Sequence, residues 1–301
     1  MKDMVQLNRI LVPVDKSDSS LISQETAASL AKKIKAEVTV LHVIPSSLSY
    51  EKMESQPASQ YIPSTVEEGV LRAREREMAT LEGLYKEGER IMDEARSLFE
   101  EEQVEVNTDM IRENDVAQTL IDYSRNFDLT VMGSHGENQT DLYALGSVTK
   151  KVIRETNCPT LVVKKVSAFQ KMLVCVEDSE HSIGALKYAS ALAEKLSSQI
   201  TLLNVSESTV SKKSSIAIKK VGNQVLRDSP YAAGFAESKF EEIVEQGFPP
   251  NVIPDVAQKG QFDLIVLGRK AGKTRGFSPK SVVEEVAERA KCPVLIVPQR
   301  D

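Results

Sequence analysis

The feature that most constrains the fold is an internal repeat. Four segments recur in the same order: ILVPVDKSDSS as MLVCVEDSEHS, VTVLHV as ITLLNV, FDLTVMG as FDLIVLG, and GSVTKKVIRETNCPTLVV as KSVVEEVAERAKCPVLIV. The separation between matching segments falls from 162 residues to 134, so the first copy carries about 27 residues more than the second. Four collinear matches indicate a tandem duplication. We therefore expect two domains, 1–166 and 167–301.

Each copy alternates short apolar runs with helical patterns. In the first copy we expect strands at 9–14, 38–43, 104–111, 129–132 and 160–163, and helices at 19–35 and 115–126. In the less regular second copy, we expect a helix after Val205 that is interrupted near Gly222 and Pro230, and a third strand near 242–246. Strands that alternate with helices predict right-handed parallel crossovers. The predicted class is α/β: two tandem Rossmann-like domains, each a five-stranded mostly parallel sheet with helices on both faces.

The extra material of the first copy, about 45–102, begins turn-rich and becomes helical from residue 65, where apolar residues recur at intervals of three and four. Gly83 and Gly88 each weaken this helix by about 1 kcal/mol relative to alanine. Two interpretations are open. The segment is a long helix laid on the sheet with its far end projecting, or it is a helix that docks a partner or pairs two chains.

Composition excludes several classes of protein. The net charge is -6, and no basic run with interleaved aromatic residues occurs, which argues against a nucleic-acid-binding surface. The first fifteen residues are too polar for a signal peptide or a membrane span, so we expect a cytoplasmic protein without membrane contact. Cys158, Cys175 and Cys292 are widely separated, which predicts neither a disulfide framework nor a metal site. Cys158 and Cys292 are expected to be buried as small apolar residues.

A glycine-rich stretch follows the strand expected at 129–132. Gly133, Gly136 and the pair Gly146-Ser147 stand at G-x2-G-x9-G-S spacing. Such glycines let backbone N–H groups approach an anion, and the N-terminus of the following helix adds a partial positive charge. Ligands of doubly wound sheets bind beyond the carboxyl ends of the strands, where Asp15 and Val43 also fall. The sequence therefore predicts a phosphate-binding site at this edge.

This spacing resembles the nucleotide-binding motif of the universal stress protein family, and VPVDKS around Asp15 resembles the end of that family's first strand. The resemblance covers nearly the whole chain outside 45–102. It implies adenine nucleotide alpha hydrolase-like domains that bind ATP, ADP or AMP, with Mg²⁺ held through phosphate oxygens and water. It also implies a regulatory role in the stress response and pairing through the terminal strands 160–163 and 294–297. The two copies could then pair internally and mimic a dimer, and a homodimer of whole chains stays open.

The resemblance also assigns roles to residues of the first copy. Asp15 would contact the nucleoside, the backbone of Val43 would recognise adenine, and Pro13 and Met132 would line the base. The full predicted nucleotide-binding set is Pro13, Val14, Asp15, Val43, Met132, Gly133, His135, Gly136, Gly146, Ser147, Val148 and Thr149. From the residues alone, Asp15 could instead cap the following helix, and His135 could be a solvated loop residue. We assign no chemistry to His42 or His181.

The second copy departs from the motif. Glu177 replaces Asp15, Lys280 replaces Gly146, and the loop is one residue shorter. A side chain at position 280 hinders close approach to an anion, so this site is expected to be degenerate. The loop is basic, however, and its side chains could hold an anion instead. The residues of this possible weak second site are Glu177, Val205, Gly268, Arg269, Gly272 and Ser281.

Three functional hypotheses stay open. The first is an ATP-binding module without efficient turnover, because no group of catalytic residues is evident and we predict none. The second is a slow ATPase or nucleotide-transfer enzyme of the same architecture. The third is a protein-interaction scaffold with vestigial sites. The segment GRKAGKT from Gly268 resembles a P-loop, but it is one residue short and Gly276 and Pro279 interrupt the helix that should follow.

Overall fold

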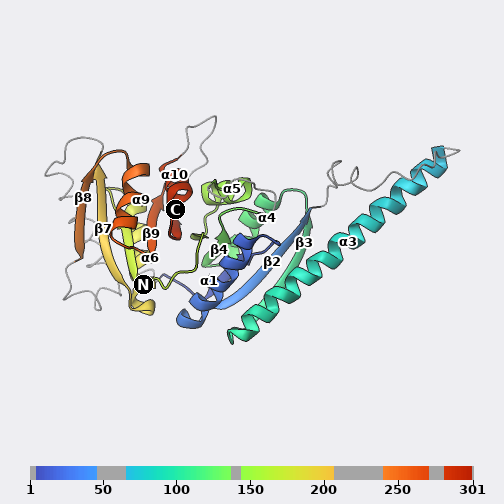
Figure 1. The fold of residues 1–301 in the computed structure, drawn as a ribbon, viewed down its shortest axis with the longest axis horizontal. Helices are drawn as coiled ribbons and strands as arrows, with labels where there is room; N and C mark the ends of the chain where they lie inside the picture. The colour runs from blue at the N-terminus through green and yellow to red at the C-terminus, as the bar shows by residue number, and fades with distance from the viewer. Residues whose placement is uncertain (1–4, 46–65, 137–143, 207–239, 271–280, 300–301) are drawn as a thin grey trace.

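The computed structural model describes residues 5–45, 66–136, 144–206, 240–270 and 281–299, which form one ten-stranded sheet with helices on both faces (Figure 1). The first copy contributes β1 Arg9–Pro13, α1 Asp18–Ile34, β2 Glu37–Pro45, α3 Val66–Glu101, β3 Val106–Glu113, α4 Val116–Tyr123, the 3-10 helix η1 Ser124–Asn126, β4 Leu129–Gly133, α5 Ser147–Glu155 and β5 Thr160–Val163. The second copy contributes β6 Lys171–Cys175, α6 Glu180–Leu196, β7 Gln199–Ser206, β8 Glu241–Gln246, α9 Pro249–Lys259, β9 Leu264–Arg269, α10 Val282–Arg289 and β10 Val294–Pro298.

The sheet order is β3-β2-β1-β4-β5-β10-β9-β6-β7-β8, so the two copies repeat one topology. All pairs within a copy are parallel, which confirms the predicted class. The expected pairing of the terminal strands is also confirmed, because β5 and β10 join antiparallel at the centre. The two predicted sheets are therefore halves of one. The helix expected after Val205 lies outside the described residues.

Two layers of helices cover the sheet. On one face, α1 contacts both α3 and α6, and the apolar core beneath them is continuous across the two copies. On the other face, α4 contacts α5, α5 contacts α10, and α10 contacts α9. The starts of α1 and α6 follow one rule, because Ser17 and Ser179 cap them with their hydroxyl oxygens. The duplicated sequence thus folds into duplicated local structure.

The long helix α3 lies against the sheet only through its C-terminal part. That part buries Ile91, Met92, Ala95 and Phe99 and contacts α1, β2 and β3. Figure 1 shows its N-terminal part extending past the edge of the sheet. The first interpretation, a helix laid on the sheet with a projecting end, is therefore the observed one, and partner docking by that end stays a prediction.

The cysteines behave as expected for small apolar side chains. Cys158 and Cys292 are buried, and all three cysteines are in the reduced thiol form. Burial raises the pKa of the Cys292 thiol to about 11. Among the described helices, none is long and apolar enough to cross a bilayer.

Candidate functional site

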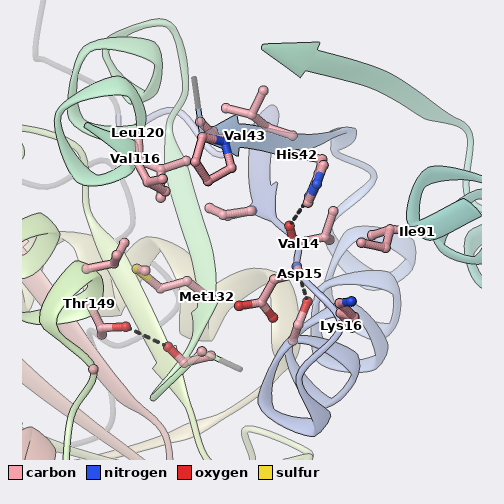
Figure 2. A pocket seen from close by; sticks show the side chains of 18 of the residues that line it. Val14, Asp15, Lys16, His42, Val43, Ile91, Val116, Leu120, Met132 and Thr149 are labelled. Carbon is pink, nitrogen blue, oxygen red and sulfur yellow. Dashed lines mark hydrogen bonds between the residues drawn. The ribbon is translucent and has the colours of Figure 1, made fainter. Parts of the chain in front are cut away.

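A pocket of about 410 Å³ opens at the carboxyl ends of β1, β2 and β4. In the sheet, β1 lies between β2 and β4, so the strand order reverses beside β1. Such a reversal is where doubly wound sheets bind ligands. Every residue that the sequence predicts for the first site lines this pocket, and Figure 2 shows several of them, Asp15, Val43, Met132 and Thr149 among them, around one hollow.

Asp15 is anchored by one carboxylate oxygen. Its Oδ1 accepts hydrogen bonds from the backbone N–H of Ser17 at 3.0 Å and from the Ser17 hydroxyl at 2.5 Å. The alternative that Asp15 caps α1 is wrong, because Ser17 is the N-cap and accepts from the N–H of Ser20. The second oxygen, Oδ2, lies toward Gly136, where an added Cβ would stand 2.9 Å from it. Asp15 thus presents Oδ2 to the pocket in a fixed orientation.

Two glycines of the loop are required for different reasons. A Cβ on Gly133 would lie 2.7 Å from the carbonyl oxygen of Ser19, so this glycine lets α1 pack closely on the end of β4. A Cβ on Gly136 would meet Asp15 in the pocket itself. The close backbone approach predicted for Gly133 therefore serves helix packing, and Gly136 keeps the pocket open.

The N-terminus of α5 forms the polar end of the pocket. Gly146 is the N-cap, and as a glycine it has no side chain that could cap the first turn. Its φ of -62° is one that any residue adopts, so a lysine there would act through its side chain and not through backbone strain. Hydrogen bonds from Gly146 N–H to the Ser134 carbonyl, 2.8 Å, and from the Thr149 hydroxyl to the Gly133 carbonyl, 3.1 Å, fix α5 against the loop. The amides of the first turn, which the N-cap glycine leaves without a side-chain acceptor, are oriented to receive an anion.

His135 is half-buried in the pocket wall. Its ring Nδ1 hydrogen-bonds with the Ser134 hydroxyl at 2.9 Å, and its backbone carbonyl accepts from the Ser17 hydroxyl at 3.4 Å. The histidine therefore ties the glycine loop to the loop that carries Asp15.

The opposite end of the pocket is apolar. Its lining side chains are Pro13, Leu41, Val43, Val116, Leu120 and Met132. Behind them, Nδ1 of His42 lies 2.8 Å from the carbonyl oxygen of Val14 (Figure 2). A carbonyl only accepts, so Nδ1 carries the proton, and the bond holds the ends of β1 and β2 together. His42, to which the sequence assigns no chemistry, thus lines the pocket.

Helix α3 supplies a wall that the sequence does not predict. Leu84, Glu87 and Ile91 line the pocket from this helix. Nζ of Lys16 lies 3.1 Å from Oε1 of Glu87, so an ion pair links the loop after β1 with α3. Hydrogen bonds from Arg90 and then from Lys16 lower the pKa of Glu87 to about 2, and the carboxylate stays charged at neutral pH.

Comparison with known proteins identifies the family. The sequence model of the universal stress protein family matches residues 6–164 and again 168–298. This chain belongs to the universal stress protein family. It is 24% identical to universal stress protein Rv2623 of Mycobacterium tuberculosis, over 95% of this chain and 95% of that protein.

Other universal stress proteins agree with this assignment. Universal stress protein MJ0531 of Methanocaldococcus jannaschii is 28% identical over 52% of this chain and 82% of its own. The crystal structure of a universal stress protein from Archaeoglobus fulgidus superimposes with a TM-score of 0.73 at 20% identity and covers 98% of this chain and 100% of that one. That structure supports the fold.

In the second universal stress protein domain, the equivalent groups are committed elsewhere. Oε1 of Glu177 lies 2.7 Å from Nε2 of His181, and this hydrogen bond is the main cause of the lowered pKa of Glu177. Ser281 caps α10, so its hydroxyl accepts from the N–H of Glu284. The guanidinium of Arg269 donates to the carbonyl of Thr156 in the first domain, and burial lowers its pKa. Three of the residues predicted for the second site are thus already bonded within the protein.

The remaining residues of the weak second site add little to it. Gly268 repeats the packing role of Gly133, because its Cβ would lie 2.4 Å from the carbonyl oxygen of His181. Val205 is partly buried against the apolar core. Gly272 and Lys280 lie outside the described residues.

Proposed function

We propose that the first domain binds ATP, or another adenine nucleotide, and that the protein is a cytoplasmic regulatory module of the stress response. The observation that carries this proposal is the N-terminus of α5, which has a glycine as its N-cap and opens into a pocket with an apolar opposite end. A polyanion joined to a flat apolar ring matches both ends. ADP and AMP share this chemistry and differ in the number of phosphates that reach α5.

The ligand would lie across the carboxyl ends of the strands. The base would fill the apolar end beside Val43 and Met132, and the phosphates would accept from the first-turn amides of α5. Between them, Oδ2 of Asp15 is the group that can accept a hydrogen bond from a ribose hydroxyl. Its partner oxygen is already held by Ser17, which fixes the carboxylate before the ligand arrives.

A magnesium ion would accompany the phosphates rather than occupy a site made by side chains. Among the described residues, no cluster of three or more histidine, cysteine, aspartate or glutamate side chains could hold a metal. Mg²⁺ commonly keeps several waters and binds through substrate phosphates with one or two carboxylates. The residues present fit that mode, because the Asp15 carboxylate lies beside Gly136 of the loop.

We propose binding without efficient turnover. Hydrolysis requires a group that positions water and charges that stabilise the transition state. The titratable side chains of the pocket already hold partners, since Asp15 bonds to Ser17, His135 to Ser134 and Glu87 to Arg90. A slow ATPase stays the rival, and it differs from a binding module by its phosphate release.

Calorimetric titration of nucleotide-stripped protein with ATP and Mg²⁺ tests the proposal. We expect one site per chain, abolished by Gly146→Lys, which places a long side chain in front of the α5 amides. Gly83→Lys is the matched control, because nothing lies within 4 Å of a Cβ at that position. Asp15→Asn should weaken binding about 10-fold. No heat in the wild type, or equal affinity in Gly146→Lys, would overturn the assignment.

A further inference from the structure

The junction between the two domains contains a pseudo-two-fold axis. Leu161 of β5 lies opposite Leu295 of β10, and these two leucines occupy equivalent positions in the two copies. Flanking pairs are exchanged by the same axis, since Val162 faces Val294 and Thr160 faces Ile296. Helices α5 and α10 contact each other across this axis on one face of the sheet.

Two ion pairs cross the axis. Arg154 of α5 donates from Nε and Nη2 to the two oxygens of Glu284, at 3.1 and 2.8 Å. Nζ of Lys150 lies 2.8 Å from Oε1 of Glu288. The Glu284 side chain is 4% exposed and that of Glu288 is 14% exposed. Carboxylates this buried depend on their partners, because an unpaired charge loses hydration without compensation.

The repeat places these four residues in equivalent pairs. Aligning KKVIRE of α5 with EEVAER of α10 makes Lys150 equivalent to Glu284, and Arg154 equivalent to Glu288. The pseudo-two-fold axis therefore relates the positions of one ion pair to the positions of the other. The charge at each position on α5 is opposite in sign to the charge at the equivalent position on α10. Both cations belong to the first domain, and both carboxylates belong to the second.

This arrangement decides which surfaces can pair. If two first domains paired in this way, each Lys150 would face an Arg154. If two second domains paired, each Glu284 would face a Glu288. Either combination sets like charges against each other at positions that are largely buried on α10, with side chains 4% and 14% exposed, and partly exposed on α5, with side chains 29% and 46% exposed. Such unpaired contacts give an interface its specificity.

We infer that the surface formed by β5 and α5 selects an acidic partner helix of the α10 type and rejects a second copy of itself. The surface formed by β10 and α10 correspondingly selects a basic partner helix of the α5 type and rejects a second copy of itself. The internal pairing is then set by charge as well as by strand register. The strand edges of β5 and β10 are equivalent and apolar, so strand pairing alone would also permit two identical domains to pair through them. The charges on α5 and α10 exclude such pairs.

Charge reversal in the full chain tests this inference. Lys150→Glu with Arg154→Glu makes both helices acidic, as in a pair of second domains. Glu284→Arg with Glu288→Lys makes both basic, as in a pair of first domains. The variant with all four substitutions restores opposite charges with their positions exchanged. Hydrogen exchange is read in the peptides that contain β5 and β10, with those that contain β2 and β7 as the internal reference.

We expect exchange at β5 and β10 to be at least 10-fold faster in both like-charged variants, unchanged at β2 and β7, and slow again in the four-site variant. Thermal midpoints should fall by about 5 °C or more in the like-charged variants and recover with the exchange rates. The controls Lys151→Glu and Glu285→Lys alter neighbours that pair within their own domains, with Asp115 and Arg289, and should leave the junction protected.

Two results would overturn the inference. One is wild-type protection at β5 and β10 in both like-charged variants, and the other is a four-site variant that exchanges as fast as they do. Glu284 also sits in the first turn of α10, where an arginine is unfavourable. If the four-site variant does not fold, the variant with only Lys150→Glu and Glu288→Lys takes its place. It avoids the first turn of α10, because Glu288 lies in the last turns of that helix, and exchange at β5 and β10 decides between the same two results.

Discussion

Gly88 and Gly83 of α3 offer a matched pair of substitutions with different expected effects on stability. Both are glycines within the helix, so alanine at either position gains about 0.5 to 1 kcal/mol in helix propensity. Their surroundings differ. Nothing lies within 4 Å of a Cβ on Gly83, whereas a Cβ on Gly88 would stand 2.7 Å from Sδ of Met110 and 3.1 Å from Cδ2 of His42.

The magnitudes follow from these contacts. Gly83→Ala should raise the free energy of unfolding by the propensity gain of about 0.5 to 1 kcal/mol. Gly88→Ala receives the same gain but must move Met110 and His42, and overpacking of this kind costs typically 1 to 3 kcal/mol. The net effect should lie between no change and a loss of about 2.5 kcal/mol, so Gly88→Ala should be less stable than Gly83→Ala by about 1 to 3 kcal/mol.

Gly88→Ala should also weaken nucleotide binding. The pocket is lined by Leu84, Glu87 and Ile91, which surround position 88 on α3. If the added methyl group pushes α3 away from His42, these lining residues move with the helix. Gly83→Ala should leave binding unchanged. Chemical denaturation and calorimetric titration of both variants measure the two effects. If Gly88→Ala were as stable as Gly83→Ala with wild-type affinity, the argument that this glycine sets the approach of α3 would be wrong.

Two further changes test single contacts. Ser17→Ala removes the cap of α1 and the hydroxyl hydrogen bond to Asp15 but keeps the bond from the backbone N–H, so we expect a loss of about 1 kcal/mol in denaturant unfolding together with weaker nucleotide binding; unchanged affinity would show that Asp15 does not need the hydroxyl as an anchor. Glu87→Gln tests the pairs that this carboxylate forms with Arg90 and Lys16 by their pH dependence: because the folded pKa of Glu87 is lowered to about 2 from 4.5, its contribution should be complete above pH 4.5 and lost as the pH falls toward 2. The difference in thermal midpoint between wild type and Glu87→Gln should therefore vanish near pH 2, and a constant difference down to that pH would contradict the assignment.

Much of the first site is readable from the sequence because strand ends and glycine spacing are local patterns. The carboxyl ends of three strands are indicated by the apolar run ending in Asp15, by the run ending at Val43 and by the loop that starts at Gly133. Parallel pairing then brings them to one edge of the sheet. The first turn of α5 is found the same way, since Gly146 and Ser147 directly precede a helical pattern.

The wall made by α3 could not be predicted in this way. Leu84, Glu87 and Ile91 have helical spacing, which indicates a face of a helix but not which strand lies beneath it. The approach is set by Gly88 against His42, a contact between residues 46 positions apart. Likewise, the reversed charges of KKVIRE and EEVAER are visible in the sequence, but only the register of β5 on β10 shows that they face each other.

The antiparallel junction of β5 and β10 also decides how the two copies can diverge. The carboxyl ends of the strands lie at one edge of the sheet in the first domain and at the opposite edge in the second. Loops that follow the strands therefore open in opposite directions, and no single small molecule touches both sets. A difference such as Lys280 in the second copy, where the first has Gly146, therefore leaves the geometry of the first site unaffected.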